Sequence, residues 1–186
     1  MTRTLEGEGK RKSRAPLVLS VRFDLTLEAQ VTASGATWLD HQLLVRDKSP
    51  LSEGGFGREV REALQDRIDH LASEGLVRRQ GNRIIFARNL LDTLRQREID
   101  EAAAQIAAST GLAHRPLAEG EYVSGAFRKR LSLASGRFVM IDDGLGFSLV
   151  PWRPALEREL GRHVTGIVRG TGIDWTFGRQ RGLGIG

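Results

Sequence analysis

Cysteine is absent from the 186-residue chain, and this absence excludes disulfide bonds and thiolate metal sites. Long hydrophobic runs are also lacking, because no apolar stretch approaches the roughly 20 residues that a membrane-spanning helix requires. The basic N-terminus is not followed by the apolar segment of a secretory signal. The sequence therefore predicts a cytoplasmic protein with no membrane partner.

Residues that carry catalysis are scarce and scattered. Tyr122 is the single tyrosine, and its sequence neighbours do not offer the metal or base cluster that a tyrosine nucleophile needs. The glycines of Gly54–Gly57 lack the Lys-Ser/Thr of a phosphate-binding P-loop, and no GxSxG motif occurs. The histidines show no metal-ligand spacing; they are His41, His70, His114 and His163. We therefore expect no enzymatic activity, no metal and no cofactor.

The charge balance is basic and points to polyanionic partners. Lys and Arg number 28 against 23 Asp and Glu, which gives a net charge of +5 and a pI near 10.4. A basic domain favours nucleic acid above other partners. Residues 1–16 are polar and include Lys10-Arg11-Lys12, so we expect a basic disordered tail. Such a tail could clamp phosphates, or it could be only a linker.

Residues 17–118 are predicted to form a strand followed by a helical subdomain. Leu19, Val21 and Phe23 alternate with polar residues, and this period of two predicts a half-buried strand or hairpin over Leu17–Ala33. Apolar residues at helical spacing then predict helices over residues 36–45, 58–74 and 89–110.

A basic hairpin is predicted between the second and third of these helices. The run Leu76–Phe86 turns at Gly81-Asn82 and carries three arginines, Arg78, Arg79 and Arg83. Helix, glycine and basic hairpin in this order are typical of a winged helix. In such a fold the helix approaches a groove while the arginines contact phosphate. A solvated basic hairpin in an ordinary helical subdomain is the alternative.

Residues 119–186 are predicted to form a small antiparallel β-barrel-like module with one short helix, so that the whole chain is α+β. Asp143-Gly144 predicts a tight turn between two apolar strands, and Pro154 suits the start of a short helix with Leu156 and Leu160 on one face. Basic residues occur at one end of the first strand and in the Arg/Gly tail; they are Arg128, Lys129, Arg130, Arg179 and Arg181. Flexible Arg-Gly segments can bind single-stranded nucleic acid.

Several stretches together resemble one protein family, with VPWRPALE and FGRQRG as the most specific segments. The stretches are Gly35–Leu44, Gly54–Leu64, His70–Glu98, Ala134–Gly166 and Asp174–Gly186. They are similar to the uncharacterised domain at the C-terminal end of relaxases, the mobilisation nucleases of conjugative plasmids and integrative elements. The resemblance runs from about Val18 to the last residue.

The resemblance implies a role in DNA mobilisation without catalysis. Relaxases nick DNA with a tyrosine nucleophile and a histidine-bound metal in an N-terminal domain, and none of those residues matches a position here. We therefore expect a non-catalytic accessory module that contacts the DNA backbone through Arg78, Arg79, Arg83, Arg128, Lys129, Arg130, Arg179 and Arg181. Two alternatives are a module that docks on the relaxase or the transfer proteins, with Trp38 or Trp152 exposed, and a truncated remnant.

Overall fold

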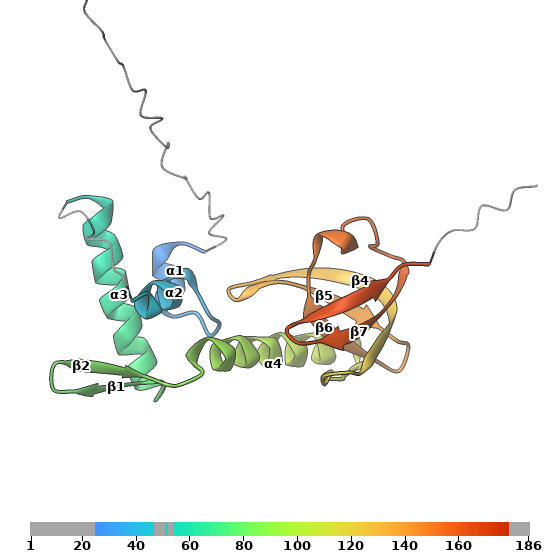
Figure 1. Cartoon of the computed structure of the whole chain (residues 1–186), viewed down its shortest axis with the longest axis horizontal. Coiled ribbons are helices and arrows are strands. Elements are labelled where there is room, and N and C mark those ends of the chain that lie inside the picture. The colour runs from blue at the N-terminus through green and yellow to red at the C-terminus, as the bar shows by residue number, and fades with distance from the viewer. Residues whose placement is uncertain (1–24, 47–50, 52–53, 179–186) are drawn as a thin grey trace, which may run out of the picture.

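The computed structural model describes residues 25–46, 51 and 54–178 (Figure 1). A helical cluster with a β-hairpin lies at one end and a larger sheet at the other, and one long helix runs between them. The mixed α+β class is confirmed. The predicted basic tail, the first part of the predicted strand, Arg179 and Arg181 lie outside the described residues.

The helical cluster consists of α1 (Leu27–Val31), α2 (Trp38–Leu44) and α3 (Phe56–Ser73). The strand predicted over Leu17–Ala33 is wrong in its second half, where α1 lies. Thr26 caps this helix, since its Oγ1 accepts a hydrogen bond from the Ala29 N–H at 3.1 Å. The cap and the helix-forming residues that follow it outweigh the two-residue alternation, which continues past Leu27 through Ala29, Val31 and Ala33.

Arg67 on α3 holds the three helices together from a fully buried position. Its Nε and Nη2 donate to the two carboxylate oxygens of Asp40 on α2, each at 2.9 Å. Its remaining N–H groups donate to the carbonyls of Val31, Ala33 and Gly35. All five guanidinium donors therefore have acceptors, as a buried charge requires.

The predicted hairpin is confirmed as β1 (Val77–Gln80) paired with β2 (Arg83–Phe86). Gly81 takes a positive φ of 58° in the turn, which a side chain would strain. The long helix α4 (Leu90–Thr110) follows and is also confirmed. Its first turns pack on the helical cluster through Leu90 and Leu94, and its last turns pack on the sheet.

The second module is an open six-stranded sheet in the order β3-β6-β5-β4-β7-β8. The strands are β3 (Ala113–His114), β4 (Tyr122–Leu133), β5 (Gly136–Asp142), β6 (Gly146–Pro151), β7 (His163–Arg169) and β8 (Gly172–Thr176). The predicted barrel-like closure is wrong, because β3 and β8 are free edges of the described sheet. The β3–β6 pair is parallel and the other neighbours are antiparallel.

Each face of this sheet has its own apolar packing. One face buries Phe127, Val139 and Val164, while the other packs Met140 and Phe147 against Ala103 and Ile106 of α4. The turn predicted at Asp143-Gly144 is confirmed between β5 and β6.

The short helix predicted from Pro154 to Leu160 is only a 3-10 turn, η1 (Pro154–Leu156). Leu156 is fully buried in the sheet core, whereas Leu160 is 51% exposed. The Gly161 N–H donates to the Phe127 carbonyl at 2.8 Å, so strand pairing with β4 begins there and stops a longer helix.

Glu98 of α4 joins the helical cluster to the sheet. Its carboxylate accepts hydrogen bonds from the N–H groups of Ala134 at 2.6 Å and Ser135 at 2.8 Å, in the β4–β5 turn. The Ser135 hydroxyl in turn accepts from the Ala36 N–H at 2.8 Å. Gly35 lies against the same carboxylate. These contacts of Glu98, Ser135, Ala36 and Gly35 link the helical cluster to the sheet, and we call them the joint.

Candidate nucleic-acid interface

The strand register divides the hairpin arginines between two faces. Arg78 lies opposite Ile85 and Arg83 lies opposite Gln80, so Arg78 and Arg83 share a face. Arg79 lies on the other face, where it forms an ion pair with Asp69 of α3. The structure thus brings two of the three predicted hairpin arginines together and uses the third as a tie to the helix.

No acidic residue occurs in residues 75–91, which include the hairpin. Arg78 and Arg83 are exposed and have no ion-pair partner among the described residues. Arg88, in the loop after β2, is also exposed, and the residues that the structure describes offer it no ion-pair partner. The sequence reasoning missed Arg88, although the same acid-free run would have included it. The free hairpin arginines are therefore Arg78, Arg83 and Arg88.

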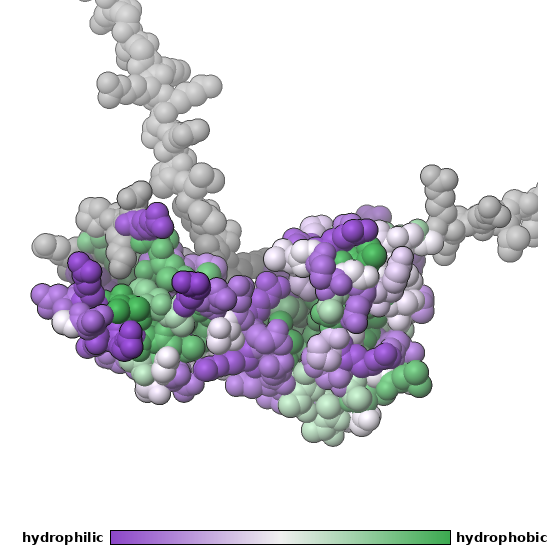
Figure 2. Space-filling model, turned by 60° about the horizontal axis from the view of Figure 1, so that its bottom comes forward, coloured by the Kyte–Doolittle hydropathy of each residue, from purple (hydrophilic) through white to green (hydrophobic). Residues whose placement is uncertain are grey.

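The hairpin end of the molecule combines charge with exposed apolar groups. On the face seen in Figure 2 it carries hydrophilic side chains with apolar ones among them. Ile84 and Ile85 of β2 are both more than a third exposed. Arginine with neighbouring aliphatic groups suits contact with phosphate and sugar, which carry no direct sequence information.

The exposed face of α3 is mostly acidic. Four acids and two arginines are exposed on this helix: Glu59, Glu62, Asp66 and Asp69 against Arg58 and Arg61. Arg58 pairs with Glu62 at 4.0 Å, and Asp69 is the partner of Arg79. A carboxylate face repels phosphates. The charge of α3 therefore argues against the predicted approach of this helix to a groove, and leaves phosphate contact to the hairpin.

The predicted basic residues of β4 are largely neutralised by neighbours. Arg128 Nε lies 3.2 Å from Asp142 Oδ2. Arg130 reaches both the carboxylate of Glu157, at 3.3 Å, and its carbonyl oxygen, at 2.6 Å. Lys129 alone has no partner among the described residues. This set lies in the second half of β4, which runs toward the helical cluster and ends at the β4–β5 turn (Figure 1).

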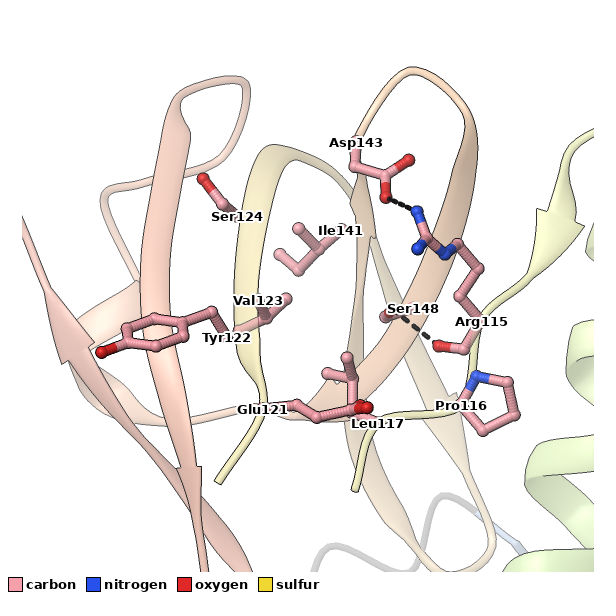
Figure 3. Close-up of a pocket in the computed structure, with 10 residues that line it drawn as sticks. All are labelled: Arg115, Pro116, Leu117, Glu121, Tyr122, Val123, Ser124, Ile141, Asp143 and Ser148. Carbon is pink, nitrogen blue, oxygen red and sulfur yellow. Dashed lines mark hydrogen bonds and ion pairs between the residues drawn. The ribbon is translucent and has the colours of Figure 1, made fainter. Parts of the chain in front are cut away.

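A cavity of about 430 Å³ opens beside β4 and the β5–β6 turn (Figure 3). Arg115 and Asp143 face one another at its mouth with Nη1 and Oδ2 2.6 Å apart, and Ser148 Oγ donates to the Arg115 carbonyl at 2.8 Å. Hydrogen bonds from the Leu145 and Gly146 N–H groups, helped by Arg115, lower the pKa of the Asp143 carboxyl. The polar groups here therefore stabilise the turn.

A serine and a histidine meet on the sheet face near this cavity. Ser124 Oγ lies 2.8 Å from His163 Nε2 and 3.0 Å from Thr165 Oγ1. Nucleophilic catalysis by such a pair needs a third group that orients the histidine. Among the described residues no carboxylate bonds to His163, and no cluster of three or more His, Asp or Glu could hold a metal ion. We assign no catalytic role to this pair.

The tryptophans proposed for protein docking are only half-buried. Trp38 lies on α2, and Trp152 follows β6 with the Arg137 guanidinium 5.6 Å from its ring centroid.

Within the described residues, no helix is both long and apolar enough to cross a membrane.

The fold and the site define a class of protein: a mixed α+β chain in which a helical cluster presents a basic hairpin and a long helix supports an open sheet. Residues 2–184 match the family described as "Protein of unknown function (DUF3363)", and the chain belongs to this family. No match was found among curated proteins or among solved structures.

Proposed function

We propose that this chain is a non-catalytic accessory domain of a relaxase-type DNA mobilisation protein, and that its hairpin contacts the DNA backbone. The observation that carries the proposal is the exposed, unpaired set Arg78, Arg83 and Arg88 on an acid-free segment. The relaxase context rests on the sequence resemblance.

The arrangement of the N-terminal elements supports a winged-helix-like role for the hairpin. α1, α2 and α3 form a contacting cluster, and β1 and β2 follow α3 directly. The acidic surface of α3 supports contact through the hairpin, as the wing, over contact through the helix. Binding through phosphates gives little base specificity, and each neutralised phosphate contributes about 0.9 to the slope of log affinity against log salt.

Fluorescence anisotropy with a labelled 20-base-pair duplex across a salt series tests this proposal. The variant Arg78→Gln/Arg83→Gln/Arg88→Gln removes three free cations without adding acids. We expect weaker binding and a salt slope lower by about 2–3. The matched control, Arg58→Gln/Arg97→Gln/Arg158→Gln, removes the same charge elsewhere. Equal affinity for the two triple variants, or no binding by the wild-type chain at low salt, would contradict the proposal.

A protein-docking role is the second candidate, and exposed apolar residues near the start of α3 favour it. Phe56 is 64% exposed, and Leu44 and Val45 at the end of α2 are each more than a third exposed. Such residues suit a partner protein better than phosphates. A pull-down with a relaxase catalytic domain, repeated with Phe56→Ser, tests this candidate.

A further inference from the structure

An open groove of about 700 Å³ lies at the free β8 edge of the sheet, far along the chain from the hairpin. The segment around η1 forms one wall, and the β7–β8 hairpin forms the other. The residues that matter for its chemistry are Arg153, Arg169, Thr171, Trp175 and Phe177. Its volume lies within the range of small-molecule sites, about 300–1,000 Å³.

Two arginines from separate elements converge on Gly172 at one end of the groove. Arg169 is the cross-strand partner of Gly172 in the β7–β8 pair. The Arg153 guanidinium lies so close to Gly172 that a Cβ at this position would be 3.2 Å from Arg153 Nη2. Glycine therefore makes room for the Arg153 guanidinium, and Arg169 stands directly across the β7–β8 pair from the same residue.

The charge at this end of the groove is not balanced. Arg153 is exposed and has no ion-pair partner among the described residues. Arg169 has one partner, Asp174, with Nε and Oδ2 3.8 Å apart and both side chains largely exposed. Two neighbouring guanidinium groups with a single loose carboxylate leave a site for an anion, and guanidinium groups match phosphate geometry well.

Aromatic rings line the same groove. Trp175 and Phe177 are two positions apart along β8 and its continuation, so they point to the same side of the strand, opposite to the side of Gly172. The groove therefore spans the free edge of β8, with the rings on one side and the arginines on the other. Trp175 is half-buried against the sheet core, whereas Phe177 is 38% exposed. A ring and two arginines that line one groove at a strand edge can stack a base and hold its phosphate.

We propose that this groove binds a nucleotide unit, with its phosphate on Arg153 and Arg169 and its base against Phe177. The unit is either a free nucleotide or one residue of a single-stranded nucleic acid. This site goes beyond the proposed function, because the hairpin contacts a duplex backbone and the groove takes an unpaired base. It does not depend on the hairpin assignment.

The test uses the full chain in the Arg78→Gln/Arg83→Gln/Arg88→Gln background, so that hairpin binding does not contribute. Labelled dT10 is titrated by anisotropy, and AMP is titrated by calorimetry and as a competitor of dT10. We expect Arg153→Gln or Phe177→Leu to weaken binding by at least about fivefold, since one stacked base contributes about 1–3 kcal/mol. The matched controls are Arg158→Gln on the neighbouring segment and Phe56→Leu on α3, both exposed and outside the groove.

Each outcome decides the proposal. Direct AMP binding that depends on Arg153 identifies a free nucleotide as the ligand. Binding of dT10 alone, again dependent on Arg153, identifies a single strand. Both results support the site. Binding of neither probe, or equal effects of Arg153→Gln and Arg158→Gln, overturns it. Loss of duplex binding in the hairpin variant with dT10 binding retained would separate the two sites, and circular dichroism verifies that each variant is folded.

Discussion

Replacement of Arg67 by methionine should be the most damaging single change to the helical cluster. Arg67 is fully buried, and its guanidinium satisfies both oxygens of Asp40 and three backbone carbonyls. Methionine fills part of the volume but donates no hydrogen bond. The Arg67→Met variant would therefore leave a buried carboxylate with only the Thr37 N–H and hydroxyl as partners.

The expected cost follows from this unpaired charge. Removing one partner of a buried ion pair typically costs about 3–5 kcal/mol. For a chain of this length, about 2–4 °C of melting temperature is lost for each kcal/mol, so a fall of about 6–20 °C is expected. The three carbonyls add to the cost only where water cannot replace the arginine.

Urea unfolding, followed by circular dichroism and by tryptophan fluorescence, measures this change. The two signals test whether the helical cluster and the sheet unfold together. The double variant Asp40→Leu/Arg67→Met removes both charges, and it should regain part of the lost stability because no carboxylate stays unpaired. A loss below about 1 kcal/mol in Arg67→Met, or a double variant less stable than the single one, would refute the reasoning.

Two further predictions concern the joint and the sheet edge. Gly35→Ala should destabilise the chain by about 1–3 kcal/mol in urea, because the new Cβ overlaps the Glu98 carboxylate that holds the β4–β5 turn. Gly54→Ala, with open space around its Cβ, is the control, and an equal effect of both would contradict the argument. Burial lowers the pKa of His114 despite the opposing charge of Asp100. Below about pH 6.5 the unfolded chain therefore binds more protons than the folded chain. The contribution of His114 to the free energy of unfolding is fully present above that pH and is lost as the pH drops through the folded-state pKa. Melting curves from pH 7.5 to 5 should show this fall, and His114→Gln should flatten it while exposed His41→Gln does not.

Local patterns in the sequence determined much of the secondary structure. The apolar stripes predicted α3 and α4, and the glycine-containing turns predicted both hairpins, because helical periodicity and positive φ are properties of a few neighbouring residues. The acid-free run around Arg78 and Arg83 was also visible before the fold was known. By contrast, the two-residue alternation that runs on through α1 misled, because the cap at Thr26 and the helix-forming residues after it outweighed it.

Only the tertiary structure decided which charges are free. Arg128 and Arg130 looked like Lys129 in the sequence, yet carboxylates 14 and 27 residues away pair with them. The openness of the sheet, the buried Arg67–Asp40 pair and the meeting of Arg153 with Arg169 at Gly172 likewise depend on contacts between distant segments. The sequence by itself determined where the long helices α3 and α4, the turns and the positive charge occur, because these follow from neighbouring residues. Long-range packing decided which of those charges remain available to a ligand.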